Sequence, residues 1–583
     1  MIPLLQIKNL SLDFNTESGI VKALQNISFD VQRGETVAIV GESGSGKSVT
    51  SLSILQLLGT PPAIFPNGEI LFSKDGKQPL NLLQLKAEEI RQIRGNEIAM
   101  IFQEPMTSLN PVFTCGEQVM ETLLLHQKIS RKDARLKTIE WFDKVNLPNP
   151  PGLFERYPHQ LSGGQKQRVM IAMAMSCLPS LLIADEPTTA LDVTVQKTIL
   201  LLLKELQQQF NMGVIFISHD LGIVSEVADR IIVMYKGKIV EQGTVKNILQ
   251  FPNHPYTQGL LACRPVLHAR GERLPVVSDF MEVSSSGEII SKVQQKVFPL
   301  TSRSYDNDAS NDNSSAPVQT IESLVTVNNL RVWFAGKKNF FGRSSDFVKA
   351  IDDISFEVYK GETLGLVGES GSGKTTLGRT LLRLIEPTSG EIIYKGQNLL
   401  NYPLSLLREL RKDMQIVFQD PYSSLNPRLT IGHAIQEPLK VHGILKNDTA
   451  RKEKVMELLE KVNLKPEHYN RYPHEFSGGQ RQRIVIARAL ALNPAFIICD
   501  ESVSSLDVSV QAQVLNLLND LKKEFGFTII FISHDLSVVH YISDRIMVMH
   551  NGRIEETGSS DQIYYHPGTS YTQKLISSLP PKI

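Results

Sequence analysis

The chain has 583 residues, more than one hydrophobic core accommodates, so at least two domains are expected. Lys plus Arg and Asp plus Glu number 61 each, so the chain lacks the excess of basic residues that is typical of non-specific nucleic-acid binders. The four cysteines have no C-x-x-C pair, which argues against a disulfide framework and a zinc site and favours reduced cytosolic thiols.

No stretch approaches the length of uncharged apolar sequence that a membrane-spanning helix needs, so none is predicted. The apolar start of the chain is short and has no charged leader or cleavage site. We therefore predict a first strand there and not a signal peptide.

The first motif along the chain is GESGSGKS at residues 41–48, between an apolar run and a helical pattern. In that context it predicts a loop whose backbone N–H groups surround phosphate oxygens, with a lysine for the β- and γ-phosphates and a serine hydroxyl for Mg²⁺. The predicted nucleotide-binding residues are Gly41, Ser43, Gly44, Gly46, Lys47 and Ser48. The alternative is a simple glycine turn between a strand and a helix.

The motif recurs as GESGSGKT at residues 368–375, again after an apolar run. Two matches in the same context disfavour the simple turn. The second set of binding residues is Gly368, Ser370, Gly371, Gly373, Lys374 and Thr375.

The other motifs also occur twice, in the same order, which indicates a duplicated domain. We place the domains at 1–264 and 323–583, with a flexible, partly disordered linker at 265–322 that is rich in Ser, Asn and Asp. The first copy has extra residues near 60–89, which we interpret as a longer hairpin and loop.

Continuous apolar runs at 181–184, 214–217, 496–499 and 528–532 are typical of parallel strands covered on both faces. Helical patterns at 195–210 and 510–525 separate them, and further helices are expected between each phosphate loop and these strands. The predicted fold class is therefore α/β, with a helical insertion in each copy.

Adjacent carboxylates end a buried strand in each copy: Asp185 and Glu186, then Asp500 and Glu501. At the carboxyl end of a parallel strand, the aspartate would hold Mg²⁺ and the glutamate would align and deprotonate a water. An acidic turn would be the simpler interpretation if no phosphate loop preceded it.

His219 and His534 follow apolar strands, and Gln103 and Gln419 follow Phe102 and Phe418. The histidines could hold a γ-phosphate and the water in line, and the neutral amides could contact both Mg²⁺ and water. Each residue alone carries little weight.

Ser162, Gly163 and Gly164, matched by Ser477, Gly478 and Gly479, precede helical runs and predict a second anion site in each copy. One nucleotide does not need two such sites from one domain.

These motifs resemble those of the ATP-binding-cassette (ABC) family, whose signature motif is similar to residues 161–165 and 476–480. The resemblance implies two P-loop NTPase domains, each with an antiparallel β subdomain and a helical subdomain, packed head to tail. It implies that each phosphate loop binds ATP together with the signature of the other domain. Phe14 and Phe334 lie where the family stacks an aromatic ring on adenine, although most members have Tyr there.

The segments 102–111 and 418–427, and His254-Pro255-Tyr256, resemble the peptide/nickel importer branch. This implies an ATPase at the cytoplasmic face of the inner membrane that serves two permease subunits and a periplasmic or lipid-anchored solute-binding protein. The neutral charge balance predicts no nucleic-acid partner. The cysteine cluster of some members is missing around Cys263, so we predict no iron–sulfur centre.

The solute stays open between peptides, glutathione and nickel chelates. A non-transport twin-cassette ATPase would predict a charged helical linker, zinc-type cysteines or a basic face, which the sequence lacks. An exporter or a sugar importer is disfavoured by the His-Pro-Tyr segment.

Overall fold

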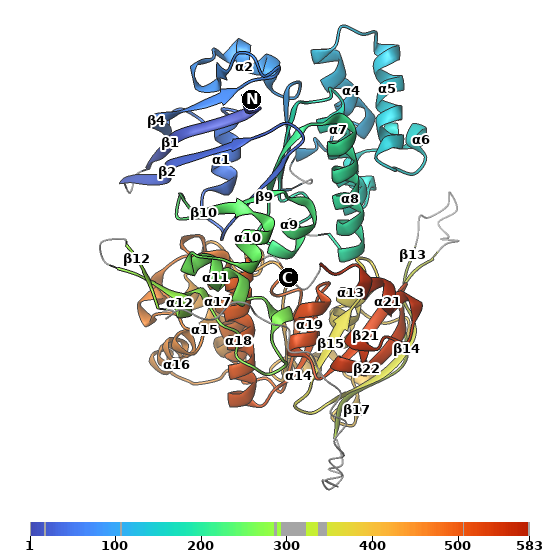
Figure 1. Cartoon of the computed structure of the whole chain (residues 1–583). Coiled ribbons are helices and arrows are strands. Elements are labelled where there is room, and N and C mark those ends of the chain that lie inside the picture. The colour runs from blue at the N-terminus through green and yellow to red at the C-terminus, as the bar shows by residue number, and fades with distance from the viewer. Residues whose placement is uncertain are drawn as a thin grey trace, which may run out of the picture.

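The computed structural model describes residues 2–16, 19–104, 108–189, 191–284, 288–292, 322–335, 347–504 and 506–580. It contains two halves of the same architecture, stacked one above the other in Figure 1. The first half ends at residue 292, and the second half begins at residue 322.

Each half contains an antiparallel sheet of four strands, in the order β2-β1-β4-β5 and β14-β13-β16-β17. The alternating burial along β1 and β13 reflects one face packed on the core and one left to solvent. The strands are β1 (Leu5–Thr16), β2 (Gly19–Val31), β4 (Ala63–Phe72), β5 (Leu80–Asn81), β13 (Ser323–Ala335), β14 (Phe347–Tyr359), β16 (Ser389–Tyr394) and β17 (Gln397–Asn398). The longer β4 accounts for part of the extra sequence in the first copy.

A second sheet of six strands forms the centre of each half, in the orders β10-β9-β3-β8-β7-β6 and β18-β19-β20-β15-β21-β22. Its strands are parallel except for the edge strands β10 and β22. They are β3 (Thr36–Val40), β6 (Ile98–Ile101), β7 (Leu181–Asp185), β8 (Gly213–Ile217), β9 (Arg230–Tyr235), β10 (Lys238–Thr244), β15 (Thr363–Val367), β18 (Met414–Val417), β19 (Phe496–Asp500), β20 (Thr528–Ile532), β21 (Arg545–His550) and β22 (Arg553–Ser559). The four predicted apolar strands are confirmed.

Helices cover the central sheets and form the predicted helical insertions. In the first half they are α1 (Lys47–Ile54), α2 (Ala87–Ile93), α4 (Cys115–His126), α5 (Arg131–Lys144), α6 (Pro150–Phe154), α7 (Gly163–Met175), α8 (Val193–Phe210), α9 (Leu221–Val227), α10 (Val245–Gln250) and α11 (Pro255–Ala262). In the second half they are α13 (Lys374–Leu381), α14 (Leu404–Leu410), α15 (Ile431–Val441), α16 (Asp448–Lys461), α17 (Gly478–Leu490), α18 (Val508–Phe525), α19 (Leu536–Ile542), α20 (Ser560–Tyr565) and α21 (Ser570–Ser577). Among the described residues, no helix combines the length and apolarity that a membrane crossing needs.

The first part of the predicted linker is ordered and packs on the second half, which corrects the expectation of a flexible spacer there. It forms the 3-10 turn Pro265–Leu267, α12 (Val277–Phe280), β11 (Met281–Val283) and β12 (Ile289–Ser291). The reason is that its apolar side chains are buried, including Leu274 and Phe280. Residues 293–321 lie outside the described residues.

Three hydrogen bonds from two side chains help to fix this segment to α18 and α19. Asn516, which is buried, donates from Nδ2 to the Leu274 carbonyl at 2.8 Å, and its Oδ1 accepts from the Leu274 N–H at 2.9 Å. The Tyr541 hydroxyl donates to the Glu272 carbonyl at 2.6 Å. Segment 265–283 therefore joins the two halves.

Asn516→Ala should weaken this junction, because both backbone groups of Leu274 lose a buried partner. We expect local opening of residues 265–283 to become easier by about 2 kcal/mol, measured as hydrogen exchange roughly 30-fold faster in that segment. The matched control is Asp520→Asn, since its ion pair with Arg273 is exposed and worth at most about 1 kcal/mol. Equal exchange in the Asn516 variant and the parent would contradict this role.

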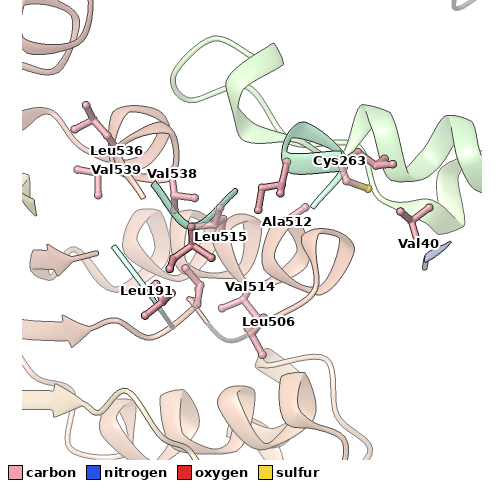
Figure 2. Packing of buried hydrophobic residues seen from close by; sticks show 14 of the residues in the cluster. Val40, Leu191, Cys263, Leu506, Ala512, Val514, Leu515, Leu536, Val538 and Val539 are labelled. Carbon is pink, nitrogen blue, oxygen red and sulfur yellow. The ribbon is translucent and has the colours of Figure 1, made fainter. Parts of the chain in front are cut away.

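The largest hydrophobic cluster runs through both halves. Figure 2 shows Leu191 and Cys263 of the first half in the same cluster as Ala512, Val514 and Leu515 of α18. The halves therefore share apolar packing as well as polar contacts.

Candidate nucleotide sites between the two halves

The phosphate loops follow β3 and β15 and have the backbone that the motif requires. A Cβ on Gly41, at φ 152°, would lie 2.2 Å from the Met234 carbonyl oxygen, and one on Gly368 would lie 2.1 Å from that of Met549. Gly46 and Gly373 are left-handed caps at which α1 and α13 begin. The glycines therefore leave a narrow space lined by main chain, as phosphate binding needs.

The loop lysines are almost fully buried and are hydrogen-bonded to their own loops. Lys47 Nζ donates to the Gly41 carbonyl at 2.7 Å and to the Glu42 carbonyl at 3.0 Å. Lys374 Nζ makes the matching bonds at 2.7 and 2.8 Å. Each ammonium is thus held inside the loop that the sequence assigns to phosphate.

The predicted Mg²⁺ residues are paired in both halves. Ser48 Oγ lies 3.2 Å from Asp185 Oδ1, and Thr375 Oγ1 lies 3.0 Å from Asp500 Oδ1. Burial raises the pKa of Asp185 to about 6, against the opposing effect of the Ser48 hydrogen bond. A hydroxyl and a carboxylate are oxygen ligands of the kind Mg²⁺ prefers, so these residues fit the ion.

Glu186 lies where the predicted catalytic residues meet. Its Oε2 accepts from Gln103 Nε2 at 3.0 Å and from Thr189 Oγ1 at 2.9 Å, and its Oε1 lies 3.2 Å from His219 Nδ1. Burial favours the neutral acid, but hydrogen bonding and charge from His219 prevail and lower the pKa of Glu186 to about 2. The same contact raises the pKa of His219 despite its burial.

The second half repeats this cluster with two differences. Gln419 Nε2 donates to Glu501 Oε2 at 2.7 Å, and His534 Nδ1 lies 3.6 Å from the same oxygen. The Ser504 hydroxyl donates to the Glu501 carbonyl and not to its carboxylate. Glu186 and Glu501 both have φ of 47°, a left-handed backbone that is rare outside glycine and typical of functional sites.

The two signature segments form exposed helix N-termini. Ser162 caps α7 and Ser477 caps α17, and Gln165 and Gln480 complete the capping boxes. Gly163 and Gly478 are exposed, so their N–H groups are available to an anion.

Reciprocal contacts join each phosphate loop to the other half. The Ser43 N–H donates to Asp507 Oδ2 at 2.8 Å, and the Ser370 N–H donates to Asp192 Oδ1. Thr194 Oγ1 donates to Glu369 at 2.8 Å. Sequence reasoning assigned Asp192 and Asp507 no role, because nothing in the local sequence shows a partner in the other half.

The signature motifs lie next to these contacts. In the second half, Gly479 packs on Val510, and the adjacent Ser509 donates to Glu42 of the first phosphate loop. In the first half, Gly164 packs on Val195, next to Thr194. The arrangement is therefore head to tail, although no hydrogen bond joins Ser477 to the first phosphate loop among the described residues.

A cavity lies between the halves and is lined by His219, Asp220, His534 and Asp535. Arg264 also lines it and is 7% exposed, and its Nη1 has no hydrogen-bond partner within the described residues. Sequence reasoning missed Arg264, which falls at the predicted domain boundary.

The predicted adenine-stacking residues differ in environment. Phe14 is partly buried and packs against the core of its half, whereas Phe334 is 43% exposed. Phe14 pairs with Val21 on β2, close to Ala23, whose carbonyl borders Gly46. Ala190 and Ser505, which stand two residues before Asp192 and Asp507 in the sequence, lie outside the described residues.

Comparison with known proteins shows the family of the chain. The ABC transporter model matches residues 24–189 and 351–504, and the model for the oligopeptide/dipeptide transporter C-terminal region matches residues 240–281. The chain is 49% identical over 99% of its length to glutathione import ATP-binding proteins of Salmonella choleraesuis and Escherichia coli, and covers 89% of each. A solved ATP-binding cassette dimer bound to ADP and Pi is 28% identical over 40% of this chain and 98% of its own, with a TM-score of 0.37.

The duplicated sites, the reciprocal loop contacts and the family matches lead to one conclusion. The chain belongs to the ABC transporter family, as an ATP-binding protein with two nucleotide-binding cassettes on one polypeptide.

Proposed function

We propose that the chain hydrolyses ATP at two composite sites to drive the import of glutathione or a similar small peptide. The observation that carries the proposal is the complete and matched Gln–Glu–His cluster beside each phosphate loop. The oligopeptide/dipeptide transporter region and the relatives named as glutathione import proteins support the solute class.

In the first site, Lys47 would bind the β- and γ-phosphates, and Ser48 and Asp185 would hold Mg²⁺ with the help of Gln103. The ion would neutralise charge on the phosphates. Glu186 would orient the attacking water. It would accept a proton from that water once His219 turns toward phosphate, because loss of the His219 contact would raise the pKa of Glu186. Ser477, Gly478 and Gly479 would close the site.

The second site would use the matching residues of the other cassette. Those residues are Lys374, Thr375, Gln419, Asp500, Glu501 and His534, closed by Ser162, Gly163 and Gly164. Phe14 and Phe334 would stack on the two adenines.

We also propose that two permease subunits dock beside segments 102–111 and 418–427, which contain Gln103 and Gln419, and that a solute-binding protein delivers the solute. Exposed apolar side chains lie there: Val112 and Phe113 come just after segment 102–111, and Tyr422 lies within segment 418–427. Docking there would place the chain at the cytoplasmic face of the inner membrane. The cassette boundaries would lie near residues 264 and 323, with segment 265–283 between them packed on α18 and α19 of the second cassette.

Uptake in the native organism tests this function. Deleting the gene should abolish uptake of labelled glutathione, and the wild-type chain should restore it, whereas the Glu186→Gln/Glu501→Gln variant should not. Labelled dipeptides and nickel chelates are the competing solutes. Unchanged glutathione uptake with loss of nickel uptake would move the function to the nickel alternative.

A further inference from the structure

One peptide unit of each phosphate loop is held from both sides. In the first loop, the Gly41 carbonyl accepts from Lys47 Nζ at 2.7 Å, and the N–H of the same peptide, on Glu42, donates to the Tyr256 hydroxyl at 2.9 Å. The orientation of this peptide therefore links the tyrosine hydroxyl to the lysine ammonium. A rotation of the peptide would break both bonds at once.

The second loop repeats the arrangement. The Gly368 carbonyl accepts from Lys374 Nζ at 2.7 Å, and the Glu369 N–H donates to the Tyr571 hydroxyl at 3.2 Å. The tyrosines come from α11 and α21, more than 190 residues from their loops, so the match is a property of the fold and not of local sequence.

Each tyrosine ring is fixed by a second aromatic ring at the end of a central strand. Tyr256 is fully buried, with its centroid 4.5 Å from that of Tyr235, and Tyr571 stacks on His550 at 4.0 Å. A ring held in this way presents its hydroxyl at a set position. The neighbouring ring differs between the cassettes, but the contact with the loop is the same.

The loop is already supported elsewhere. The Gly237 N–H donates to the Ser45 carbonyl at 2.9 Å, and the Gly552 N–H donates to the Ser372 carbonyl at 3.0 Å. Those bonds hold the middle of the loop. The tyrosine bond holds its first peptide, whose carbonyl is one of the two loop carbonyls that accept from the lysine.

We propose that Tyr256 and Tyr571 are positioning residues for ATP binding, each setting the loop lysine of its own cassette through the Gly–Glu peptide. The proposal rests on the proposed ATPase function. It gives Tyr256, which lies in the region matched by the oligopeptide/dipeptide transporter model, a role in the nucleotide site. Tyr571 has the same role in the second cassette.

ATP binding at one loop at a time tests the proposal. In the full-length Glu186→Gln/Lys374→Ala chain, labelled ATP should bind at the first loop without hydrolysis. Adding Tyr256→Phe should raise the Kd about tenfold, because the partly buried Glu42 N–H loses its partner and the lysine loses its fixed position. Adding Tyr571→Phe should change the Kd less than twofold. In the Glu501→Gln/Lys47→Ala chain, which should bind ATP at the second loop, Tyr571→Phe should raise the Kd about tenfold. Tyr256→Phe should change it less than twofold.

Tyr235→Phe is the matched control, since it removes a hydroxyl from the same aromatic pair without touching the loop. Equal weakening at both loops by Tyr256→Phe would indicate a general folding defect and overturn the proposal, as would an unchanged Kd at both. If the parent chains bound no ATP at all, the proposed ATPase function would fail instead.

Discussion

Glu186→Gln and Glu501→Gln should each remove the turnover of one ATP site, and the double variant should lose ATPase activity roughly 100-fold or more. The amide keeps the size of the side chain but cannot accept a proton, and it loses the charge that pairs with His219 or His534. ATP binding should persist, because the phosphate-loop lysines are untouched. The measurement is steady-state phosphate release beside ATP binding by equilibrium dialysis.

Glu205→Gln is the control, since this exposed glutamate on α8 makes the same chemical change away from both sites. Full activity in either single variant would show that the two sites are not both hydrolytic, despite their matched clusters. The Thr189 hydroxyl donates to the Glu186 carboxylate, whereas the Ser504 hydroxyl donates to the Glu501 carbonyl. This difference is the structural feature that could make the turnover rates of the two sites unequal.

Ser477→Arg should abolish hydrolysis at the first phosphate loop while leaving ATP bound there. The arginine would fill the exposed N-terminus of α17, where we place a phosphate of the ATP bound at the first loop. Removing one such group of donors typically costs about 10²–10³ in turnover. The Kd for ATP should change less than threefold, because the lysine and glycines belong to the other cassette.

The cap itself needs a control, since losing a serine N-cap costs about 1 kcal/mol. Ser130→Arg removes the same kind of cap from α5, in an exposed position away from both phosphate loops. It should share any small loss of thermal stability and keep full ATPase activity. If Ser130→Arg and Ser477→Arg lost activity equally, the effect would belong to folding.

The catalytic clusters could be predicted from sequence because they follow strands that are neighbours in the sheet. Gln103, Glu186 and His219 follow β6, β7 and β8, which pair in that order. The carboxyl ends of parallel strands meet at one edge, so separate motifs with no local relation converge there. The phosphate loops could be predicted without any knowledge of strand order, because strand, loop and helix are contiguous in the sequence.

Contacts between distant segments could not be predicted in this way. Nothing near Tyr256 indicates that its hydroxyl meets the Glu42 N–H, and nothing near Asn516 indicates that it binds Leu274. The apolar residues of segment 265–283 have no clear period and therefore predict a spacer, yet several of them are buried. From sequence, the head-to-tail pairing follows only from the family resemblance; in the structure, Asp507 at Ser43 and Asp192 at Ser370 form it directly.

The central claim is that each ATP site is built from both cassettes, and one crossed measurement tests it most directly. Ser477→Arg is combined with Glu501→Gln, which leaves the first site active, and separately with Glu186→Gln, which leaves the second. Composite sites predict that Ser477→Arg abolishes the remaining phosphate release in the Glu501→Gln chain and spares it in the Glu186→Gln chain. The opposite pattern would show that each signature serves its own cassette and would contradict the account.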